Sequence, residues 1–501
     1  MALISAVLLS TARNASADVT ISGPVVGDNR SDPWIPSIPL IVGGWLDLPY
    51  RDNSPGEVTV SNEGFLFTHG ALIADTGFSG FVTIDGYGSR WANVGAITLS
   101  SGTDADSRVV VRNGAWVYTH DLVVGLHGFD ACAQLLVEGY DATLTSIGTT
   151  IVGGSDCDDV LELKDGATFF SHNVYLATTG ESGAKVLLSG YATRWASTGE
   201  FIVGQFDRAD LQITYKAKLS TVNAKIASGW GSGSNRRWGK VHVSGWDATW
   251  TNRGLLRVGT SGCGELSVDA YGTLATEDVE VYSDSGDAFI HVDGLHASWH
   301  NSGDVSILGY LPLAPSLLVD NGGLVHIDGT LTLQAHASYI PLRLVARLAN
   351  GTLSAGAIEA PDSTFEFASG RLSTGSFIGD LENAYLGMLV VGGEGEYPFT
   401  TVVGDYTQGS DARLRFTVAG PISTPLLDVA GSLSLDGKLV VRPADGTAPF
   451  RRGDTVTLFG WSGSLTGSFD QIKITLPLAP GLVWDTSKLY TTGKIRAVRA
   501  H

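Results

Sequence analysis

An apolar-x-apolar pair of residues recurs along this chain at a nearly constant step, and that step limits the folds open to it. Because side chains alternate along a strand, each pair places two apolar side chains on one buried face. Successive pairs lie about 25 residues apart, and the single step of 30 residues contains a Gly- and Ser-rich stretch at 229–238. The pairs are Val58/Val60, Val82/Ile84, Val109/Val111, Leu135/Val137, Leu161/Leu163, Val186/Leu188, Leu211/Ile213, Val241/Val243, Leu266/Val268, Ile290/Val292 and Leu317/Val319.

Each 25-residue step holds three short strands and three turns, which predicts one coil of an all-β, right-handed, single-stranded parallel β-helix. One coil cannot bury its own inner face, so coils stack and share a core. Glycine, at 64 of 501 residues, supplies the positive φ needed at the corners. We expect regular coils over 57–333, less regular coils over 334–403 and a modified capping region over 404–501. A sandwich would lack the constant register.

Alternate coils carry a tryptophan in their second strand, which gives a double repeat of about 52 residues. One register has Leu144 in place of tryptophan. A platform that faces sugars has no reason to accept leucine, so this row is predicted to be an aromatic ladder in the core. Its members are Trp91, Trp195, Trp250 and Trp299.

A second aromatic row follows the corner glycine of the same coils. It consists of Tyr87, Tyr140, Tyr191 and Trp246. These residues either pack at the corner or form an exposed row that stacks on sugar rings, and the sequence leaves both interpretations open.

Acidic residues cluster in one turn, at Asp156, Asp158 and Asp159. Clustered carboxylate oxygens suit Ca²⁺, the one cofactor that the sequence suggests. With Lys164 as a base, Asp158 and Asp159 also suit a polysaccharide lyase or hydrolase. The simpler interpretation is a set of solvated turn residues on an acidic protein.

The cysteines and three of the histidines follow the coil spacing. Cys132 and Cys157 are 25 residues apart, so adjacent coils place them for a disulfide in an oxidising compartment, and Cys263 is left single. His291, His296 and His300 gather in one coil and either bind a metal or occupy outward polar positions.

Charge and the N-terminal segment indicate an exported protein. Residues 1–17 have the apolar run and small-x-small ending of a secretion signal, and 18–56 are expected to cap the first coil or to pair with another copy. The net charge of −19 offers no basic face for duplex nucleic acid. No stretch approaches the 18 apolar residues of an integral membrane helix.

The stretch 404–441 resembles the end of the β-helical passenger of bacterial autotransporters. It has a Gly-x-Tyr-x-Gln coil at Gly404–Gln408, followed by a Leu-x-Val-x-Gly coil from Leu427. The 52-residue repeat resembles the repeats of the same surface proteins, and 453–493 resembles the closing module of autotransporter-like secreted repeat proteins. The chain ends at His501, and we expect it to lack a translocator barrel. The resemblance implies a secreted β-helix at the cell surface.

These observations together predict a non-catalytic extracellular structural or adhesive protein. Its partner would be a cell-surface or matrix glycan, or further copies of itself joined head to tail in a filament. Two alternatives stay open. One is an enzyme that cleaves polysaccharides in a groove along the helix, and the other is a phage tail fibre, which shares this fold and usually forms trimers.

Overall fold

The computed structural model is an all-β parallel solenoid with coils of about 25 residues, as predicted. It has about 13 turns and divides into two compact units, Met1–Thr198 and Gly199–His501. The residues that the structure describes are 18–22, 26–27, 40–41, 45–48, 55–74, 79–99, 106–125, 132–154, 158–178, 183–228, 238–260, 262–283, 288–309, 316–335, 345–361, 364–392 and 397–500. The predicted signal, 1–17, lies outside them.

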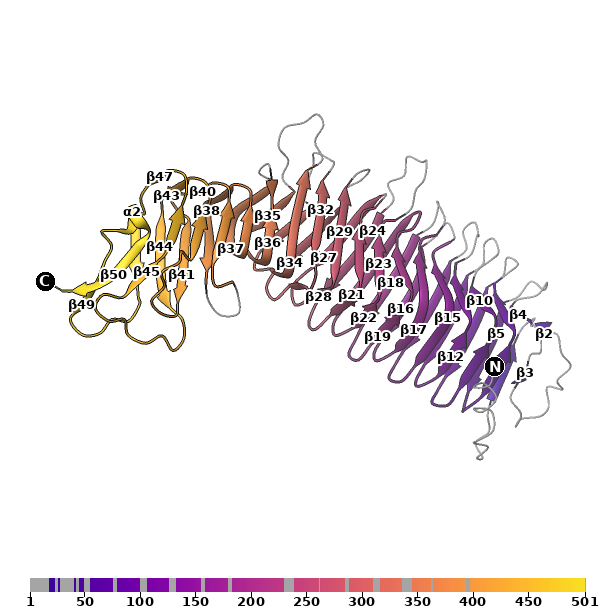
Figure 1. Cartoon of the computed structure of the whole chain (residues 1–501). Coiled ribbons are helices and arrows are strands. Elements are labelled where there is room, and N and C mark those ends of the chain that lie inside the picture. Colours follow the sequence, from indigo (N-terminus) through magenta and orange to yellow (C-terminus); the bar gives the residue numbers. More distant parts are fainter. Residues whose placement is uncertain are drawn as a thin grey trace. The chain divides into compact units, whose positions relative to one another are not determined.

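Three columns of strands build the first unit, and the strands of a column pair in parallel from coil to coil (Figure 1). The first column contains β5 (Gly56–Ser61), β8 (Gly80–Asp85), β11 (Ser107–Arg112), β14 (Ala133–Glu138), β16 (Asp158–Lys164) and β18 (Gly183–Ser189). The second contains β3 (Leu40–Ile41), β6 (Phe65–Thr68), β9 (Arg90–Asn93), β12 (Trp116–Thr119), the first halves of β15 (Thr143–Val152) and β17 (Thr168–Leu176), and β19 (Arg194–Ser197). The third contains β4 (Trp45–Leu48), β7 (Gly70–Ile73), β10 (Ala96–Leu99), β13 (Asp121–Val124) and the second halves of β15 and β17.

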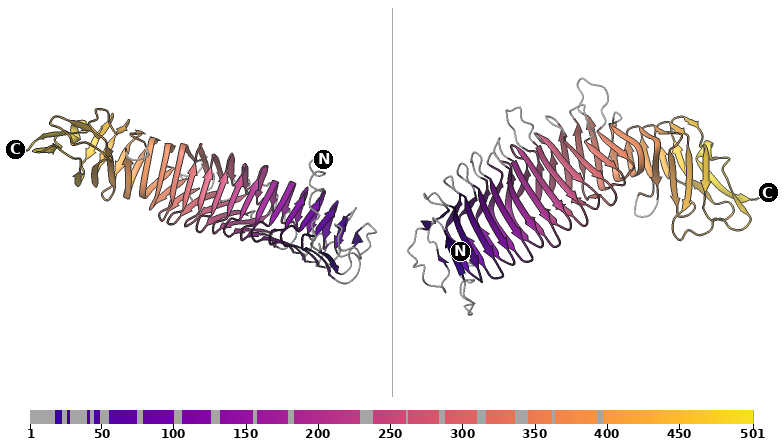
Figure 2. Two further views of the ribbon diagram at one scale, coloured as in Figure 1. Left: turned by 90° about the horizontal axis from the view of Figure 1, so that it is seen from below. Right: turned by 180° about the vertical axis from the view of Figure 1, so that it is seen from behind.

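The second unit repeats the three columns over more coils (Figure 2). The first column contains β21 (Arg208–Thr214), β24 (Trp238–Ser244), β27 (Cys263–Val268), β30 (Ala288–Asp293), β33 (Leu317–Asp320), β35 (Ala346–Ala349), the starts of β37 (Phe365–Ile378) and β38 (Leu381–Val391), β40 (Tyr406–Gln408), β43 (Leu433–Leu435) and β47 (Leu465–Gly467). The second contains β22 (Lys218–Thr221), β25 (Thr249–Asn252), β28 (Thr273–Thr276), β31 (Ser298–Asn301), parts of β34 (Leu324–Ala335), β36 (Gly351–Glu359), β37 and β38, then β41 (Arg413–Val418), β44 (Lys438–Pro443) and β48 (Gln471–Ile474). The third contains β20 (Glu200–Val203), β23 (Asn223–Ile226), β26 (Leu255–Val258), β29 (Asp278–Ser283), β32 (Val305–Gly309), the ends of β34, β36 and β37, β39 (Thr400–Val403), β42 (Leu427–Val429) and β46 (Phe459–Trp461).

The strand register within each unit confirms the spacing of the apolar pairs. Val109 lies opposite Val82 in the preceding coil and opposite Leu135 in the following one. Across the 30-residue step, Leu211 still lies opposite Val241, so the longer step adds a loop and leaves the register unchanged. The members of these pairs have exposed fractions of 2% or less, and most of the residues between them are half-buried or exposed. The core therefore runs through the interior of the coils.

Corner glycines follow the first strand of the tryptophan-bearing coils. Gly190 has φ +102°, and a Cβ there would lie 2.6 Å from the backbone nitrogen of Asp165 in the preceding coil. Both the left-handed backbone and the close approach of the neighbouring coil therefore require glycine.

Additional strands cover each end of the coil stack. β1 (Asp18–Ser22) pairs antiparallel with β5, and β2 (Val26–Gly27) pairs antiparallel with β4. At the other end, β45 (Thr455–Thr457), β49 (Leu482–Asp485) and β50 (Lys494–Arg499) form a small antiparallel sheet beside helix α2 (Leu489–Thr492). None of the helices in the described part of the chain is long and apolar enough to cross a membrane.

Candidate functional site

The four tryptophans predicted for the interior lie in the second strand column, with exposed fractions of 1% or less. They do not stack on one another. Trp91 lies in register between Leu66 and Val117, and the ring of Trp195 stacks on Phe169 with centroids 4.9 Å apart. The row is a mixed apolar column in which tryptophan alternates with other apolar residues of the intervening coils.

Each of these buried indoles donates a hydrogen bond to a hydroxyl of the preceding coil. Trp250 Nε1 donates to Thr221 Oγ1 at 3.0 Å, and Thr221 Oγ1 donates to Asn252 Oδ1 at 2.9 Å. A buried indole N–H without a partner would destabilise the fold, so the hydroxyl position is part of the repeat. The equivalent pairs are Trp91 with Thr68 (2.9 Å), Trp195 with Ser171 (2.8 Å) and Trp299 with Thr276 (2.8 Å).

The second predicted row is exposed in the first unit. Tyr87 is 81% exposed, and Tyr140 and Tyr191 also lie mostly in solvent. The coils between them carry a glycine at the matching corner: a Cβ on Gly114 would lie 3.2 Å from a ring carbon of Tyr87, and Gly166 relates to Tyr140 in the same way. An open depression of about 410 Å³ beside Tyr87 is lined by Tyr87, Gly88, Ser89, Arg90, Gly114 and Trp116.

The same corners of the second unit carry aromatic side chains in successive coils. The rings of Trp246 and Tyr271 stack with centroids 5.4 Å apart, and those of Tyr271 and His296 lie 5.0 Å apart. Tyr215 belongs to the neighbouring corner, where the backbone N–H of Lys216 donates to the carbonyl of Trp246. We call Tyr215, Trp246, Tyr271 and His296 the continuous aromatic row. All four side chains are exposed.

Sequence reasoning identified only Trp246 in the continuous aromatic row. Tyr215 and Tyr271 lie in the shorter corners of the intervening coils, which lack the Gly-aromatic pattern. The signal that marks them is their distance from the inward pair: Tyr215 follows Ile213 by two residues, and Tyr271 follows Val268 by three.

A polar cluster lies next to this row, where two strands of the first column, β30 and β33, end. His291 Nε2 lies 3.3 Å from Asp320 Oδ1, and Asn321 donates to Asp320 at 3.0 Å and to Asp293 at 2.8 Å. Burial raises the pKa of Asp320. The hydrogen bond that Asp293 forms with Asp320 lowers the pKa of Asp293. The pair therefore offers one carboxylate that stays charged and one that protonates more readily.

The structure does not bring together Asp158 and Asp159, the two predicted Ca²⁺ ligands that it describes. Asp158 is exposed and pairs with Lys185 of the next coil, whereas Asp159 is fully buried and accepts the backbone N–H of Ala133 at 2.9 Å. Adjacent residues of a strand point to opposite faces, so these two carboxylates do not share an ion. Asp156 lies outside the described residues.

The acid–base arrangement predicted for a lyase or hydrolase is not assembled either. Lys164 forms ion pairs with Glu138 at 3.4 Å and Glu162 at 3.7 Å. Asp159 is turned into the protein, so Lys164 and Asp159 do not face one substrate position.

Cys132 is disulfide-bonded, and Cys263 has a free, buried thiol. The predicted Cys132–Cys157 disulfide requires that Cys132 be oxidised and that Cys263 keep a free thiol, as observed. Cys157 lies outside the described residues.

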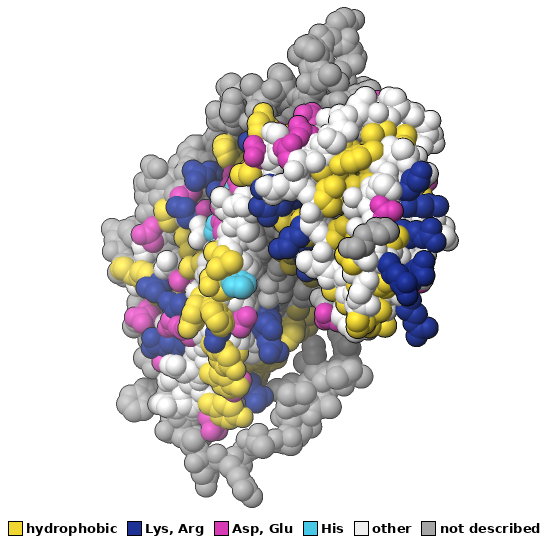
Figure 3. Space-filling model, turned by 90° about the vertical axis from the view of Figure 1, so that its left-hand side faces the viewer, with side chains coloured by type: hydrophobic (Ala, Val, Ile, Leu, Met, Phe, Trp, Pro, Cys, Tyr) yellow, Lys and Arg dark blue, Asp and Glu magenta, His cyan; other side chains and the backbone are white. Residues whose placement is uncertain are grey.

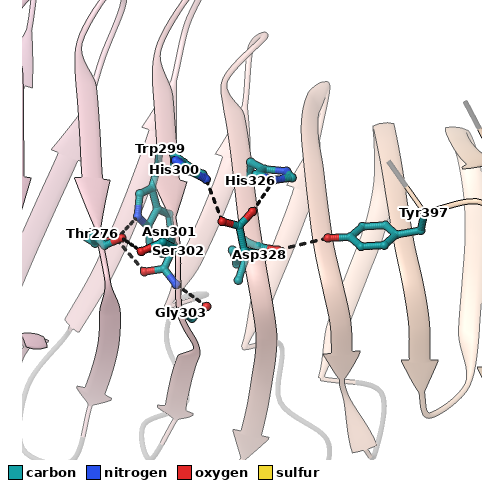
Figure 4. Close-up of polar contacts among 10 residues, drawn as sticks. Thr276, Trp299, His300, Asn301, Ser302, Gly303, His326, Asp328 and Tyr397 are labelled. Carbon is teal, nitrogen blue, oxygen red and sulfur yellow. Dashed lines mark hydrogen bonds and ion pairs between the residues drawn. The ribbon is translucent and has the colours of Figure 1, made fainter. Parts of the chain in front are cut away.

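The three clustered histidines separate into different environments. His291 belongs to the polar cluster, and His296 to the continuous aromatic row. His300 lies instead beside His326 of the next coil, and both imidazoles contact Asp328 (Figure 4). The sequence carried a signal for this pair, because His300 and His326 are 26 residues, or one coil, apart.

Basic side chains gather in and beside the C-terminal antiparallel sheet, and Figure 3 shows a cluster of dark-blue atoms on one side of the view. The exposed basic residues there are Arg451, Arg452, Lys488, Lys494, Arg496 and Arg499. This part of the chain therefore differs in charge from the acidic protein as a whole.

Comparison with known proteins finds no family model and no curated protein that match this sequence. The fold and the side-chain arrangements above are therefore the basis for inferring function.

Proposed function

We propose that this chain is a non-catalytic extracellular adhesion protein that binds glycans along its exposed corner aromatics. The observation that carries the proposal is the continuous aromatic row, in which stacked rings of successive coils face solvent over Trp246 and Tyr271. Contiguous exposed apolar patches of this kind are typical of binding surfaces. Large rings that face solvent do not stabilise the fold by burial, so their repetition needs another reason.

The chemistry of the row suits sugar rings. Aromatic faces carry a negative quadrupole that attracts the C–H face of a pyranose. Hydroxyls need a few fixed polar groups nearby, and these exist at the ends of the first-column strands. His242 Nδ1 pairs with Asp269 at 3.1 Å, two residues before Tyr271, and the Asp293–Asp320 cluster lies in the following coils. The coil-by-coil repetition favours a polymer over a single small sugar.

Strand pairing at the N-terminal end of the coils supports display of this surface by single molecules. The outer edge of β5 is already paired with β1 of the same chain over Asp18–Ser22. A strand edge that is covered within the chain cannot accept a strand from a second copy. This favours the capping interpretation of 18–56 over head-to-tail assembly.

The experiment is a binding screen of the purified protein against immobilised glycans, followed by isothermal titration calorimetry of the best ligand. We expect Trp246→Ala and Tyr271→Ala each to weaken binding at least about tenfold, the loss expected for an anchor residue worth 1.4 kcal/mol or more. Phe399→Ala is the matched control, because Phe399 is equally exposed and lies outside the row.

Binding that survives the Trp246→Ala/Tyr271→Ala double substitution would place the glycan elsewhere and overturn the proposal. So would the absence of glycan binding across the panel. Cleavage products in the same screen would favour the enzyme.

A further inference from the structure

Two histidines of successive coils stack on the outer face of the second column. His300 of β31 and His326 of β34 lie directly opposite each other in register, with ring centroids 5.3 Å apart. Both Nε2 atoms turn toward the carboxylate of Asp328, at 3.3 Å from Oδ2 and 2.8 Å from Oδ1 (Figure 4). Three metal-binding side chains thus converge on one point, and their ligand atoms lie within 4.8 Å of one another.

We propose that His300, His326 and Asp328 bind a divalent late first-row transition metal ion, with Zn²⁺ as the reference case. Nitrogen and carboxylate ligands lie 2.0–2.2 Å from Zn²⁺, so neighbouring ligands of a tetrahedral site are about 3.3 Å apart. The contact between His300 and Asp328 already has that length, and the contact between His326 and Asp328 has to lengthen by about 0.5 Å.

The donor set selects the class of metal. Two imidazoles and one carboxylate suit Zn²⁺, Cu²⁺ or Ni²⁺, whereas Ca²⁺ and Mg²⁺ require oxygen ligands. The chain's net charge of −19 further favours cation binding.

The strands beneath the site are held from both sides, so the ligands are positioned in advance. On one side, the buried Trp299 and Asn301 flank His300 and both contact Thr276 of the preceding coil (Figure 4). On the other side, Tyr397 donates to the backbone carbonyl of Ile327 at 3.4 Å. Rigid support of this kind lowers the cost of ordering a site.

The site has room for further ligands. The side chains of His300 and Asp328 are about half exposed, and that of His326 is about one third exposed. Three protein ligands leave at least one position of a tetrahedral ion open, as in catalytic rather than structural zinc sites. A water molecule or a donor atom of a partner would take that position.

The neighbouring cluster of His291, Asp293 and Asp320 provides an internal comparison. It has a single imidazole, and Asn321 already donates to both of its carboxylates. It is therefore the poorer ligand set for Zn²⁺, and His291→Ala is a control that removes a nearby histidine without touching the proposed site.

The test is isothermal titration of ZnCl₂ into untagged, chelator-treated protein, with the visible absorption of bound Co²⁺ as a second signal. We expect saturable binding of one ion per chain. Loss of an outer-shell partner alone weakens metal binding about 10–100-fold, so His300→Ala, His326→Ala and Asp328→Asn should each cost at least that much. His291→Ala should leave the affinity unchanged, and circular dichroism checks that every variant is folded.

Saturable binding that persists in all three ligand variants would overturn the proposal, as would binding that His291→Ala alone abolishes. Absence of saturable binding in the wild-type protein would overturn it directly. The glycan proposal does not depend on any of these results, because no residue of the continuous aromatic row is a ligand.

Discussion

In three of the four tryptophan-bearing coils, the corner carries one aromatic residue outside and one inside, four residues apart. In the coil at 238–260 these are Trp246, which is 55% exposed, and Trp250, which is fully buried. The indole of Trp250 has a hydroxyl partner in the preceding coil, whereas the ring of Trp246 stacks on that of Tyr271. Tryptophan therefore occurs twice in one coil, once in the core with a hydrogen-bond partner and once in solvent against a neighbouring ring.

The contrast between the buried and the exposed ring indicates that the inner position serves stability and that the outer position is free to serve binding. An interior indole removes a large apolar surface from water and also needs a partner for its N–H, so its neighbours in adjacent coils are constrained. An exterior ring has neither requirement and varies more freely among tyrosine, tryptophan and histidine. Selection on the outer positions is therefore expected to reflect what they bind.

The largest effect that tests this comparison is expected for Trp250→Ala. Truncation of a buried tryptophan removes apolar burial, leaves a cavity and deprives Thr221 of its donor, and such changes typically cost about 3–5 kcal/mol. Hydrogen exchange read by mass spectrometry should report this loss as a lower free energy of opening in β22, β25 and β28. Trp246→Ala, the same substitution outside, is the control and should leave the exchange of these strands unchanged.

Equal protection losses in the two variants would refute the division between inner and outer rows. A loss confined to the substituted coil would instead show that neighbouring coils open independently, as in a weakly coupled repeat array.

A smaller effect is expected for Thr221→Val, which keeps the shape of the side chain and removes its hydroxyl. Trp250 Nε1 and Asn252 Oδ1 would then be buried without their present partner, at a cost of about 1–3 kcal/mol. The same exchange measurement applies. Thr221→Ser retains the hydroxyl and should recover most of the loss, and if both variants are equally weakened, packing by the methyl group is the cause.

Much of the fold follows from the sequence because coil stacking converts sequence spacing into contact. The inward pairs predicted the register, and Leu144 correctly indicated an interior row, since a leucine fits an apolar column and no outward role. The indole partners were harder to foresee. Nothing in a single coil indicates that the hydroxyl of Thr221 must lie under Trp250, because the contact is formed only by stacking.

The candidate sites were predicted less well for a related reason. Asp158 and Asp159 are adjacent in sequence, yet strand alternation sends them to opposite faces. His300 and His326 are far apart in sequence, yet register places them side by side. Proximity along the chain is thus a poor guide to a site on a solenoid, and separation by one coil length is a better one.

The smallest effect is expected in the first unit, where Tyr140 and Leu144 form the outer and inner pair of one coil. Tyr140 is 69% exposed, so Tyr140→Ala should change the opening free energy of β14 and β15 by less than about 0.5 kcal/mol. Leu144→Ala, inside the same coil, should cost about 2–5 kcal/mol. Hydrogen exchange compares the two variants directly. A loss of more than 1 kcal/mol for Tyr140→Ala would mean that the tyrosine ring packs on the glycine corner of the next coil as part of the fold. The outer row of this unit would then serve stability, and a binding role would belong to the continuous aromatic row of the second unit alone.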